Sequence, residues 1–169
     1  MGIRNLIPNG RFLRVQDITL DQLRALGIRG VAFDLDNTIT PYHTGTLLPG
    51  VETWLNDLRA DGMVFGVVSN NRNPEYVRGF CELHGFSWVS PAGKPSPKGY
   101  RKVAEQLGLK PEEMLFVGDQ IYTDTFGAKR AGMRAAIVLP YSRKRRPFYY
   151  IRLLMEFPFR IAAKKGELS

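Results

Sequence analysis

The chain has 169 residues, of which 44% are hydrophobic, 24% charged and 11% aromatic. This composition is that of one ordinary globular domain, and it excludes a disordered or low-complexity chain. The single cysteine, Cys81, excludes an intramolecular disulfide and a cysteine-rich zinc site, and it favours a reducing cytosolic compartment. The sequence contains no apolar run long enough to span a bilayer and no apolar core of a secretory signal, so we expect neither a membrane-spanning helix nor export by that route.

Positive charge gathers at the C-terminal end. Residues 141–169 hold eight lysines and arginines and two glutamates, so this segment carries +6 of the net charge of +8. This distribution predicts two parts, a globular domain over residues 1–140 and a basic, aromatic and amphipathic tail over residues 141–169. A polyanionic partner is expected to bind first at this tail.

In chain order, the first predicted element is a short helix that ends near Gly27, because Thr19 to Gln22 fits an N-terminal capping box. From residue 30 to residue 139, short apolar runs then alternate with segments that begin at helix-start signals. The predicted strands are residues 30–33, 63–68, 88–89, 114–117 and 135–139, and the predicted helices between them are residues 49–62, 73–85, 96–108 and 123–132. This alternation predicts an α/β fold with a parallel sheet covered on both faces.

Two carboxylates follow the first predicted strand, in the sequence Phe33-Asp34-Leu35-Asp36-Asn37-Thr38. Ligands bind at the carboxyl ends of the strands in open parallel sheets, so Asp34 and Asp36 are expected at a binding edge. Two acidic groups this close repel each other, and a hard divalent cation such as Mg²⁺ relieves the repulsion. A calcium-binding EF-hand loop is excluded because its glycine and glutamate positions hold Ile39 and Gly45; a solvated turn remains the alternative.

Polar residues also follow the second predicted strand, where Ser69, Asn70 and Asn71 precede a helix start at Asn73-Pro74. A hydroxyl group and unpaired backbone N–H groups at a helix N-terminus form a binding site for phosphate. The alternative is that Ser69 and the asparagines only shape the turn and cap the helix.

A lysine stands after the third predicted strand, in the sequence Gly93-Lys94-Pro95-Ser96-Pro97-Lys98. A positioned ammonium group neutralises charge on phosphoryl oxygens and on a carboxylate nucleophile. Lys94 is a better candidate than Lys98, because it lies nearer the strand end and is followed by a rigid proline. A solvated loop lysine is the alternative.

The fourth predicted strand ends in Val117-Gly118-Asp119, and a further carboxylate, Asp124, stands at the start of the next helix. The carboxylate of Asp119 completes a metal site with those that follow the first strand. Asp124 fits two roles equally well, an acid stabilised by the helix dipole or a group that supports the site from behind.

Together, Asp34-x-Asp36-x-Thr38, Ser69, Lys94 and Gly118-Asp119-x4-Asp124 resemble the four motifs of the haloacid dehalogenase (HAD) superfamily of phosphohydrolases. The resemblance covers residues 30–139 and implies a Rossmann-like parallel sheet with strand order 5-4-1-2-3. Within subclass IIIA of the superfamily, the chain is similar to the YqeG-type group, which includes mitochondrial phosphatidylglycerophosphate phosphatases. The shared cues include Ser-Asn-Asn, Lys-Pro-x-Pro-Lys and Gly-Asp-Gln-x-x-Thr-Asp.

The resemblance implies roles for the acidic residues. Asp34 would be the nucleophile that forms an aspartyl-phosphate, and Asp36 would act first as general acid and then as general base. Mg²⁺ would be held by the Asp34 carboxylate, the Asp36 backbone carbonyl and Asp119. Asp124 would support these groups from behind.

The resemblance also implies a phosphate-binding set. Ser69 and the Asn70 backbone would bind the phosphoryl group, and Lys94 would stabilise its charge. Thr38 would shape the loop after Asp36. The short segment between Asp36 and Ser69 leaves no room for a large cap domain.

The tail has an amphipathic helical pattern over residues 143–165. Its polar stripe comprises Arg145, Arg152, Glu156 and Arg160, and opposite it lie Phe148, Ile151, Leu154, Met155 and Phe159. Pro158 is expected to kink or divide this helix. A basic amphipathic helix with aromatic residues suits the surface of an anionic bilayer. The alternatives are docking of the apolar face on the domain and contact with nucleic acid, which is the less favoured partner.

The sequence thus predicts a Mg²⁺-dependent phosphomonoester hydrolase that acts on phosphatidylglycerophosphate, an anionic phospholipid, at a membrane surface. Its expected location is cytoplasmic, with peripheral contact to the inner face of the membrane through the tail. One alternative is a phosphatase of a soluble sugar phosphate, a nucleotide or a nucleic-acid end, with a lid supplied by an oligomer. Another is a non-catalytic adaptor that binds membrane or RNA.

Overall fold

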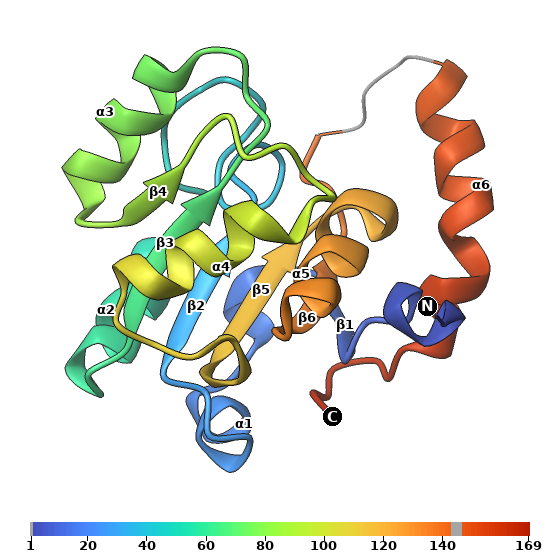
Figure 1. Ribbon diagram of the computed structural model, residues 1–169, viewed down its shortest axis with the longest axis horizontal. Coiled ribbons are helices and arrows are strands. Elements are labelled where there is room, and N and C mark those ends of the chain that lie inside the picture. Colours follow the sequence, from blue (N-terminus) through green and yellow to red (C-terminus); the bar gives the residue numbers. More distant parts are fainter. Residues whose placement is uncertain (1, 143–146) are drawn as a thin grey trace.

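The computed structural model describes residues 2–142 and 147–169, without the side chains of residues 147–149. This part of the chain forms a six-stranded sheet in the order β1-β6-β5-β2-β3-β4, with every pair parallel (Figure 1). The strands are β1 Gly10–Phe12, β2 Gly30–Phe33, β3 Val64–Val68, β4 Ser87–Val89, β5 Met114–Gly118 and β6 Arg134–Val138. The last five confirm the predicted strands and their predicted order, and β1, which we did not predict, extends the sheet beside β6.

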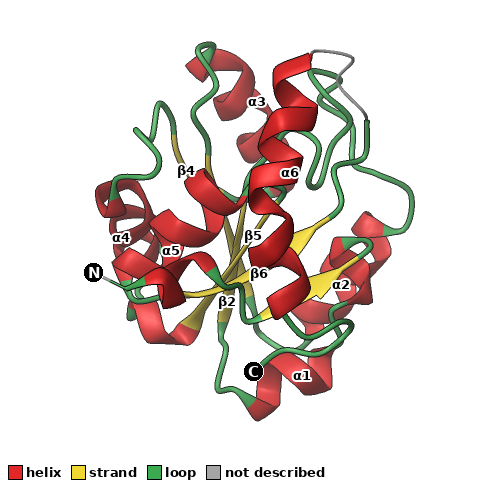
Figure 2. Ribbon diagram, turned by 90° about the vertical axis from the view of Figure 1, so that its right-hand side faces the viewer, coloured by secondary structure: helices red, strands yellow, loops and turns green. Residues whose placement is uncertain are grey.

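Helices cover both faces of the sheet, as predicted (Figures 1 and 2). One face carries α1 Leu20–Ala25, α2 Val51–Ala60 and α3 Pro74–His84, and the other carries α4 Pro97–Gln106 and α5 Phe126–Ala131. Successive residues of β2 alternate between the two cores, with Val31 and Phe33 on one side and Ala32 on the other. The carboxyl ends of the central strands are therefore held rigidly between two packed layers.

The helices α1, α3 and α4 begin where the local chemistry predicts, whereas α2 begins at Val51, after Gly50, and not at Pro49. Asn73 and Ser96 are N-caps whose side chains accept hydrogen bonds from backbone N–H groups of the first turn, and a proline follows each of them. Thr19 caps α1 in the same way, by accepting from the backbone N–H of Gln22. These caps set the lengths of the loops that leave the sheet.

The segment expected as one helix over residues 123–132 is instead a π-helical turn, Ile121–Thr125, followed by α5. The Tyr100 hydroxyl, buried on α4, donates to the Thr123 carbonyl (2.8 Å) and holds this wide turn in place. Such turns are frequent at functional sites. The predicted C-terminal cap holds, because Gly132 closes α5 with a positive φ of 99°.

The C-terminal segment folds back onto the domain. α6 Pro147–Ala162 is a single helix with Pro158 inside it, so the proline does not divide it. The chain after α6 then runs beside β1, where the Arg11 N–H donates to the Lys164 carbonyl (2.8 Å) and the Gly166 N–H to the Arg11 carbonyl (2.9 Å). The basic cluster 143–146, including Arg145 of the predicted stripe, lies outside the described residues, and so does the side chain of Phe148.

Among the helices that the structure describes, none has both the length and the apolar content that crossing a bilayer requires.

Candidate active site

The ends of several strands border one polar cavity of about 590 Å³. The cavity lies at the carboxyl edge of the sheet, where ligands bind in open parallel sheets. Its lining includes most of the predicted site residues, namely Asp34, Asp36, Ser69, Asn70, Lys94 and Asp119. The other two, Thr38 and Asp124, are buried next to it. The structure therefore brings the predicted set together from four separate loops.

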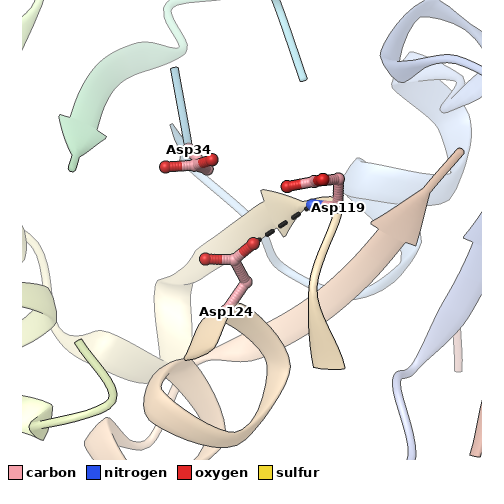
Figure 3. A group of neighbouring side chains, drawn as sticks. All are labelled: Asp34, Asp119 and Asp124. Carbon is pink, nitrogen blue, oxygen red and sulfur yellow. Dashed lines mark hydrogen bonds between the residues drawn. The ribbon is translucent and has the colours of Figure 1, made fainter. Parts of the chain in front are cut away.

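Three carboxylates lie together at the site, two in the cavity lining and one buried next to it. Oxygen atoms of Asp34, Asp119 and Asp124 lie within 4.8 Å of one another, and all three residues are buried (Figure 3). Burial, with repulsion from Asp124, raises the pKa of Asp34 to about 6 against the attraction of Lys94. Burial, with repulsion from Asp124 and Asp34, raises the pKa of Asp119 to about 8. Ionised carboxylates in this arrangement need a cation among them.

The donor set fits Mg²⁺. Within the described part of the chain, the buried Asp119 Oδ1 atom has no hydrogen-bond partner. A buried carboxylate oxygen without a donor is costly, and a divalent cation satisfies it. Asp34 and Asp119 are thus the carboxylates best placed to hold the ion.

Lys94 bridges two of the carboxylates. Its Nζ atom lies 2.6 Å from Asp34 Oδ1 and 2.8 Å from Asp124 Oδ1. Burial lowers the pKa of Lys94, but attraction by Asp124 and Asp34 outweighs it, so the pKa is raised and the ammonium stays charged. Lys98 is absent from the cavity lining, in agreement with the preference for Lys94.

The Asp124 carboxylate organises the loop that follows β5. Its Oδ2 atom accepts hydrogen bonds from the backbone N–H groups of Asp119 (3.1 Å) and Gln120 (3.0 Å). A Cβ atom at Gly118 would overlap this carboxylate, so glycine is required there. Asp124 therefore lies behind the loop that carries Asp119, and its supporting role in the site stays a prediction.

Asp36 lies apart from the carboxylate cluster. Its Oδ2 atom accepts from the Asn71 side-chain amide (3.0 Å), and its Oδ1 atom accepts from the His43 backbone N–H (2.9 Å). Sequence reasoning missed both contacts. The run Ser69-Asn70-Asn71 carried the same signal for Asn71 as for Asn70, whereas the His43 contact depends on the path of the loop.

The turn after Asp36 is tightly specified. Asn37 has a positive φ of 65°, a conformation that asparagine tolerates better than most residues. Its side-chain oxygen accepts from the backbone N–H (3.3 Å) and the hydroxyl of Ser142. Thr38 is buried in this turn, where its N–H donates to the Leu35 carbonyl (3.4 Å). Thr38 therefore contributes to the loop and not to the cavity wall.

Ser69 and Asn70 lie in the loop after β3, and Asn70 connects this loop to the loop after β4. The Ser69 hydroxyl oxygen accepts from the Asn71 backbone N–H (3.1 Å). The Asn70 side chain accepts from the Lys94 N–H (2.8 Å) and donates to the Lys94 carbonyl (3.1 Å). Asn70 thus holds the backbone that presents Lys94.

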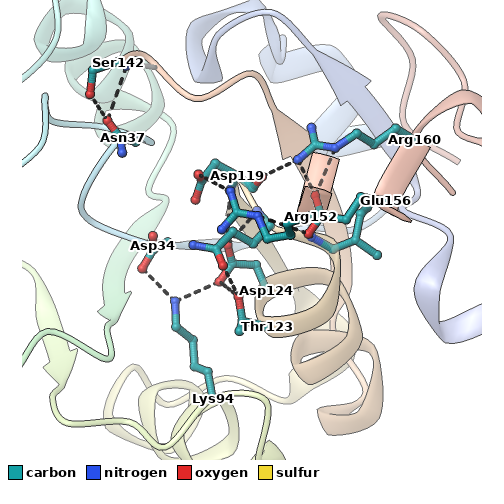
Figure 4. A network of polar contacts seen from close by, with 12 residues as sticks. Asp34, Asn37, Lys94, Asp119, Thr123, Asp124, Ser142, Arg152, Glu156 and Arg160 are labelled. Atoms are coloured by element: carbon teal, nitrogen blue, oxygen red, sulfur yellow. Dashed lines mark hydrogen bonds and ion pairs between the residues drawn. The ribbon is translucent and has the colours of Figure 1, made fainter. Parts of the chain in front are cut away.

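The helix α6 contributes charged residues that sequence reasoning did not place at the site. Arg152 lines the cavity, and Glu156 is fully buried (Figure 4). The described residues of the polar stripe, Arg152, Glu156 and Arg160, face the domain, and the apolar residues Ile151, Leu154 and Met155 are exposed. Docking through the apolar face, one of the alternatives left open, is therefore not what the structure shows. The spacing of Arg152, Glu156 and Arg160 indicated a stripe but not its partner.

Comparison with known proteins gives a consistent result. A family model described as haloacid dehalogenase-like hydrolase matches residues 41–132. Probable phosphatase YqeG of Bacillus subtilis is 29% identical over 134 residues, which cover 79% of this chain and 77% of that protein. Glyceraldehyde 3-phosphate phosphatase of Pyrococcus furiosus is 32% identical over 96 residues, which cover 52% of this chain and only 40% of that relative's length.

The fold also recurs in solved structures. A crystal structure of a HAD family hydrolase from Deinococcus radiodurans, with bound phosphate and sodium, superimposes with a TM-score of 0.54 at 18% identity. The match covers 85% of this chain and 92% of that chain. At this level of identity the two proteins share their fold.

Proposed function

The chain belongs to the haloacid dehalogenase-like hydrolases and is an enzyme of the phosphatase type, and on this premise we propose that it is a Mg²⁺-dependent phosphomonoester hydrolase acting on phosphatidylglycerophosphate at a membrane surface. The observation that carries the chemistry is the buried cluster of Asp34, Asp119 and Asp124 with Lys94 bridging two of its members. The lipid substrate and the membrane are the finer part of the proposal and depend on α6.

In this proposal Asp34 is the nucleophile. Its carboxylate attacks phosphorus, and the bond from phosphorus to the leaving oxygen breaks as the aspartyl-phosphate forms. Asp36 gives its proton to the leaving oxygen, then takes a proton from the water that attacks the aspartyl-phosphate and releases inorganic phosphate. The separate position of Asp36, held by Asn71 and His43 away from the carboxylate cluster, supports its role in proton transfer.

Other residues bind the phosphoryl group. The Ser69 hydroxyl and the Asn70 backbone N–H donate to its oxygens, and the ammonium of Lys94 balances charge near Asp34. Asp34, the Asp36 backbone carbonyl and Asp119 are the proposed metal ligands, with Thr38 and Asp124 in supporting positions. Mg²⁺ bound there supplies positive charge that polarises the phosphoryl oxygens.

The exposed face of α6 supports action at a membrane. Six large apolar residues of this helix are between 53% and 76% exposed, namely Tyr150, Ile151, Leu154, Met155, Phe157 and Ile161. Because the domain holds Arg152, Glu156 and Arg160, these apolar side chains point outward, and the basic cluster 143–146 precedes them in the sequence. Such a surface suits an anionic bilayer. In this proposal residues 1–140 form the phosphatase domain, and residues 141–169 place it on the inner face of the cytoplasmic membrane.

A phosphatase of a soluble substrate is the second candidate. The Pyrococcus furiosus relative is named for glyceraldehyde 3-phosphate, which is a small soluble phosphate ester. The structure shows no large cap over the cavity within the described residues, so a lid would come from an oligomer. This candidate predicts turnover that does not respond to lipid vesicles.

The test is phosphate release from phosphatidylglycerophosphate in anionic vesicles against a panel of soluble phosphomonoesters, with Mg²⁺ or with EDTA. Removal of the tail is a poor control, because it would also remove Arg152 and Glu156 from the site. The sharper control is a Leu154→Gln, Ile161→Gln variant, which alters only exposed side chains. The proposal is supported if the wild type prefers the lipid substrate and the variant does not. The second candidate is favoured if both proteins hydrolyse a soluble ester as fast as the lipid or faster.

A further inference from the structure

We propose that α6 is part of the active site, with Arg152 as a residue that binds the phosphoryl group and Glu156 and Arg160 as residues that position it. This inference rests on the proposed phosphatase function. It concerns residues beyond 132, where the match to the family model ends. It therefore adds to the site a group that the four motifs do not contain.

Arg152 lies in the cavity itself. Its side chain, 20% exposed, shares the cavity lining with Asp34, Ser69 and Lys94, and its Nη2 atom lies 4.0 Å from Asp119 Oδ2. Figure 4 shows Arg152 and Lys94 approaching the carboxylate cluster from separate elements. A phosphoryl group held between Asp34 and Ser69 would thus have cationic groups from two elements beside it.

The charges of the site indicate a role for Arg152 in binding the phosphoryl group. The Lys94 ammonium is already paired with Asp34 and Asp124. Asp36 and Asp119 add two further carboxylates to the cavity wall. Arg72 also lines the cavity, and Mg²⁺ at the proposed ligands would add positive charge, so Arg152 would act together with these cations on a phosphoryl dianion. A guanidinium group offers a planar fork of N–H donors that matches phosphoryl oxygens, so Arg152 provides the charge and the geometry that binding requires.

Glu156 fixes the position of Arg152 relative to the loop that follows β5. Its buried carboxylate accepts from the Ile121 backbone N–H (3.0 Å) and from Arg160 Nη2 (2.8 Å), and it pairs with Arg152 Nε at 3.8 Å. Arg160 also donates to the Asp119 backbone carbonyl. Because Ile121 begins the turn that contains Asp124, Glu156 and Arg160 together link α6 to the loop that carries both acidic residues. Glu156 thus acts through Arg152 and the loop.

The test compares Arg152→Gln and Arg152→Lys with Arg78→Gln, a control on an exposed arginine of α3. Two quantities are measured at saturating Mg²⁺, namely kinetics with p-nitrophenyl phosphate and the affinity for inorganic phosphate by isothermal titration calorimetry. Loss of a charged hydrogen-bond donor predicts that Arg152→Gln raises both KM and the Kd for phosphate by about tenfold or more. Arg152→Lys should recover only part of this loss, and Arg78→Gln should match the wild type.

Glu156→Gln tests positioning. It should raise KM in the same direction as Arg152→Gln, and the effect of the double variant should be smaller than the two single effects combined, because Glu156 acts in part through Arg152. Independent, additive effects on KM would indicate that Glu156 contributes only to folding and would overturn its positioning role.

Other outcomes separate the inference from the proposed function. If Arg152 only neutralises Asp119, Arg152→Gln would change the affinity for Mg²⁺ and leave the phosphate Kd unchanged, which would overturn the inference. A wild-type protein that hydrolyses no phosphomonoester would overturn the proposed function, and the phosphate affinities would still decide whether Arg152 binds the anion.

Discussion

The two regions that supply the cavity place their charged groups by different means. In the loops after β2, β4 and β5, each predicted charged residue follows a strand of the sheet, and hydrogen bonds within and between the loops hold it. On α6, Arg152 and Arg160 are placed by the docking of a whole helix, which depends on the buried Glu156. The comparison teaches that the order of strands and loops brings the loop residues to the cavity, whereas the residues of α6 reach it only through the docking of the helix.

The largest expected effect comes from the loop region. Asp34→Asn should reduce turnover by about a thousandfold or more, because it removes the proposed nucleophile. The fold should persist, since Asn is isosteric with Asp and Lys94 keeps its pair with Asp124. Steady-state kinetics and a thermal melt are the measurements, and near-normal turnover would contradict the assignment.

Gly118→Ala should damage the same region through packing. The added Cβ atom would overlap the Asp124 carboxylate, so we expect a loss of about 1–3 kcal/mol in the free energy of unfolding, together with weaker activity. Gly79→Ala in α3 is the matched control, because a Cβ there meets open space and alanine favours a helix. Urea denaturation gives the free energy of unfolding of both variants. Equal values would show that the loop accommodates a Cβ atom at residue 118, contrary to the prediction.

The pH dependence of stability tests the buried carboxylates of the loop region. The folded-state pKa values of Asp34, about 6, and Asp119, about 8, exceed the ordinary value of 3.8, so the folded protein binds protons more tightly than the unfolded chain. The free energy of unfolding of the metal-free protein should therefore fall as pH rises from about 4 to about 8. Mg²⁺ competes with these protons, and its stabilising effect should be greater at about pH 8 than at about pH 5.5, by on the order of 5 °C in Tm.

Thermal melts in EDTA and in Mg²⁺ at both pH values provide this measurement. Asp119→Asn is the control variant, because it should lose most of the pH dependence. An equal Mg²⁺ effect at both pH values in the wild type would contradict binding of the ion at these carboxylates.

The smallest effect on stability is expected on the outer face of α6. Leu154→Gln should change the free energy of unfolding by no more than about 0.5 kcal/mol, because the side chain is 76% exposed. It should nevertheless weaken sedimentation with anionic vesicles, since the apolar face is the proposed membrane contact. Arg101→Gln, an exposed change on α4, is the comparison variant, because it shows how much vesicle binding changes when one positive charge is removed elsewhere on the surface. Undiminished vesicle binding by Leu154→Gln would argue against this face.

Most of the fold could be predicted because its signals are local. Short apolar runs and capped helix starts indicated five of the strands and the layers that cover them. The strand β1 could not be predicted, because it is a strand through its pairing with β6 and its contacts with the segment after α6. The contact of Asp36 with Asn71 likewise joins residues 35 positions apart and depends on the approach of two loops.

The sequence by itself determined the α/β class, the order of the motifs and the gathering of Asp34, Asp36, Lys94 and Asp119 at one edge, because parallel strands bring their carboxyl ends together. Only the tertiary structure decided which face of α6 meets the domain. An amphipathic pattern favours burial of the apolar face. Here, however, the buried Glu156 carboxylate accepts hydrogen bonds from the Ile121 N–H and the Arg160 guanidinium. A buried charge with such partners is tolerated, and the apolar face is left exposed.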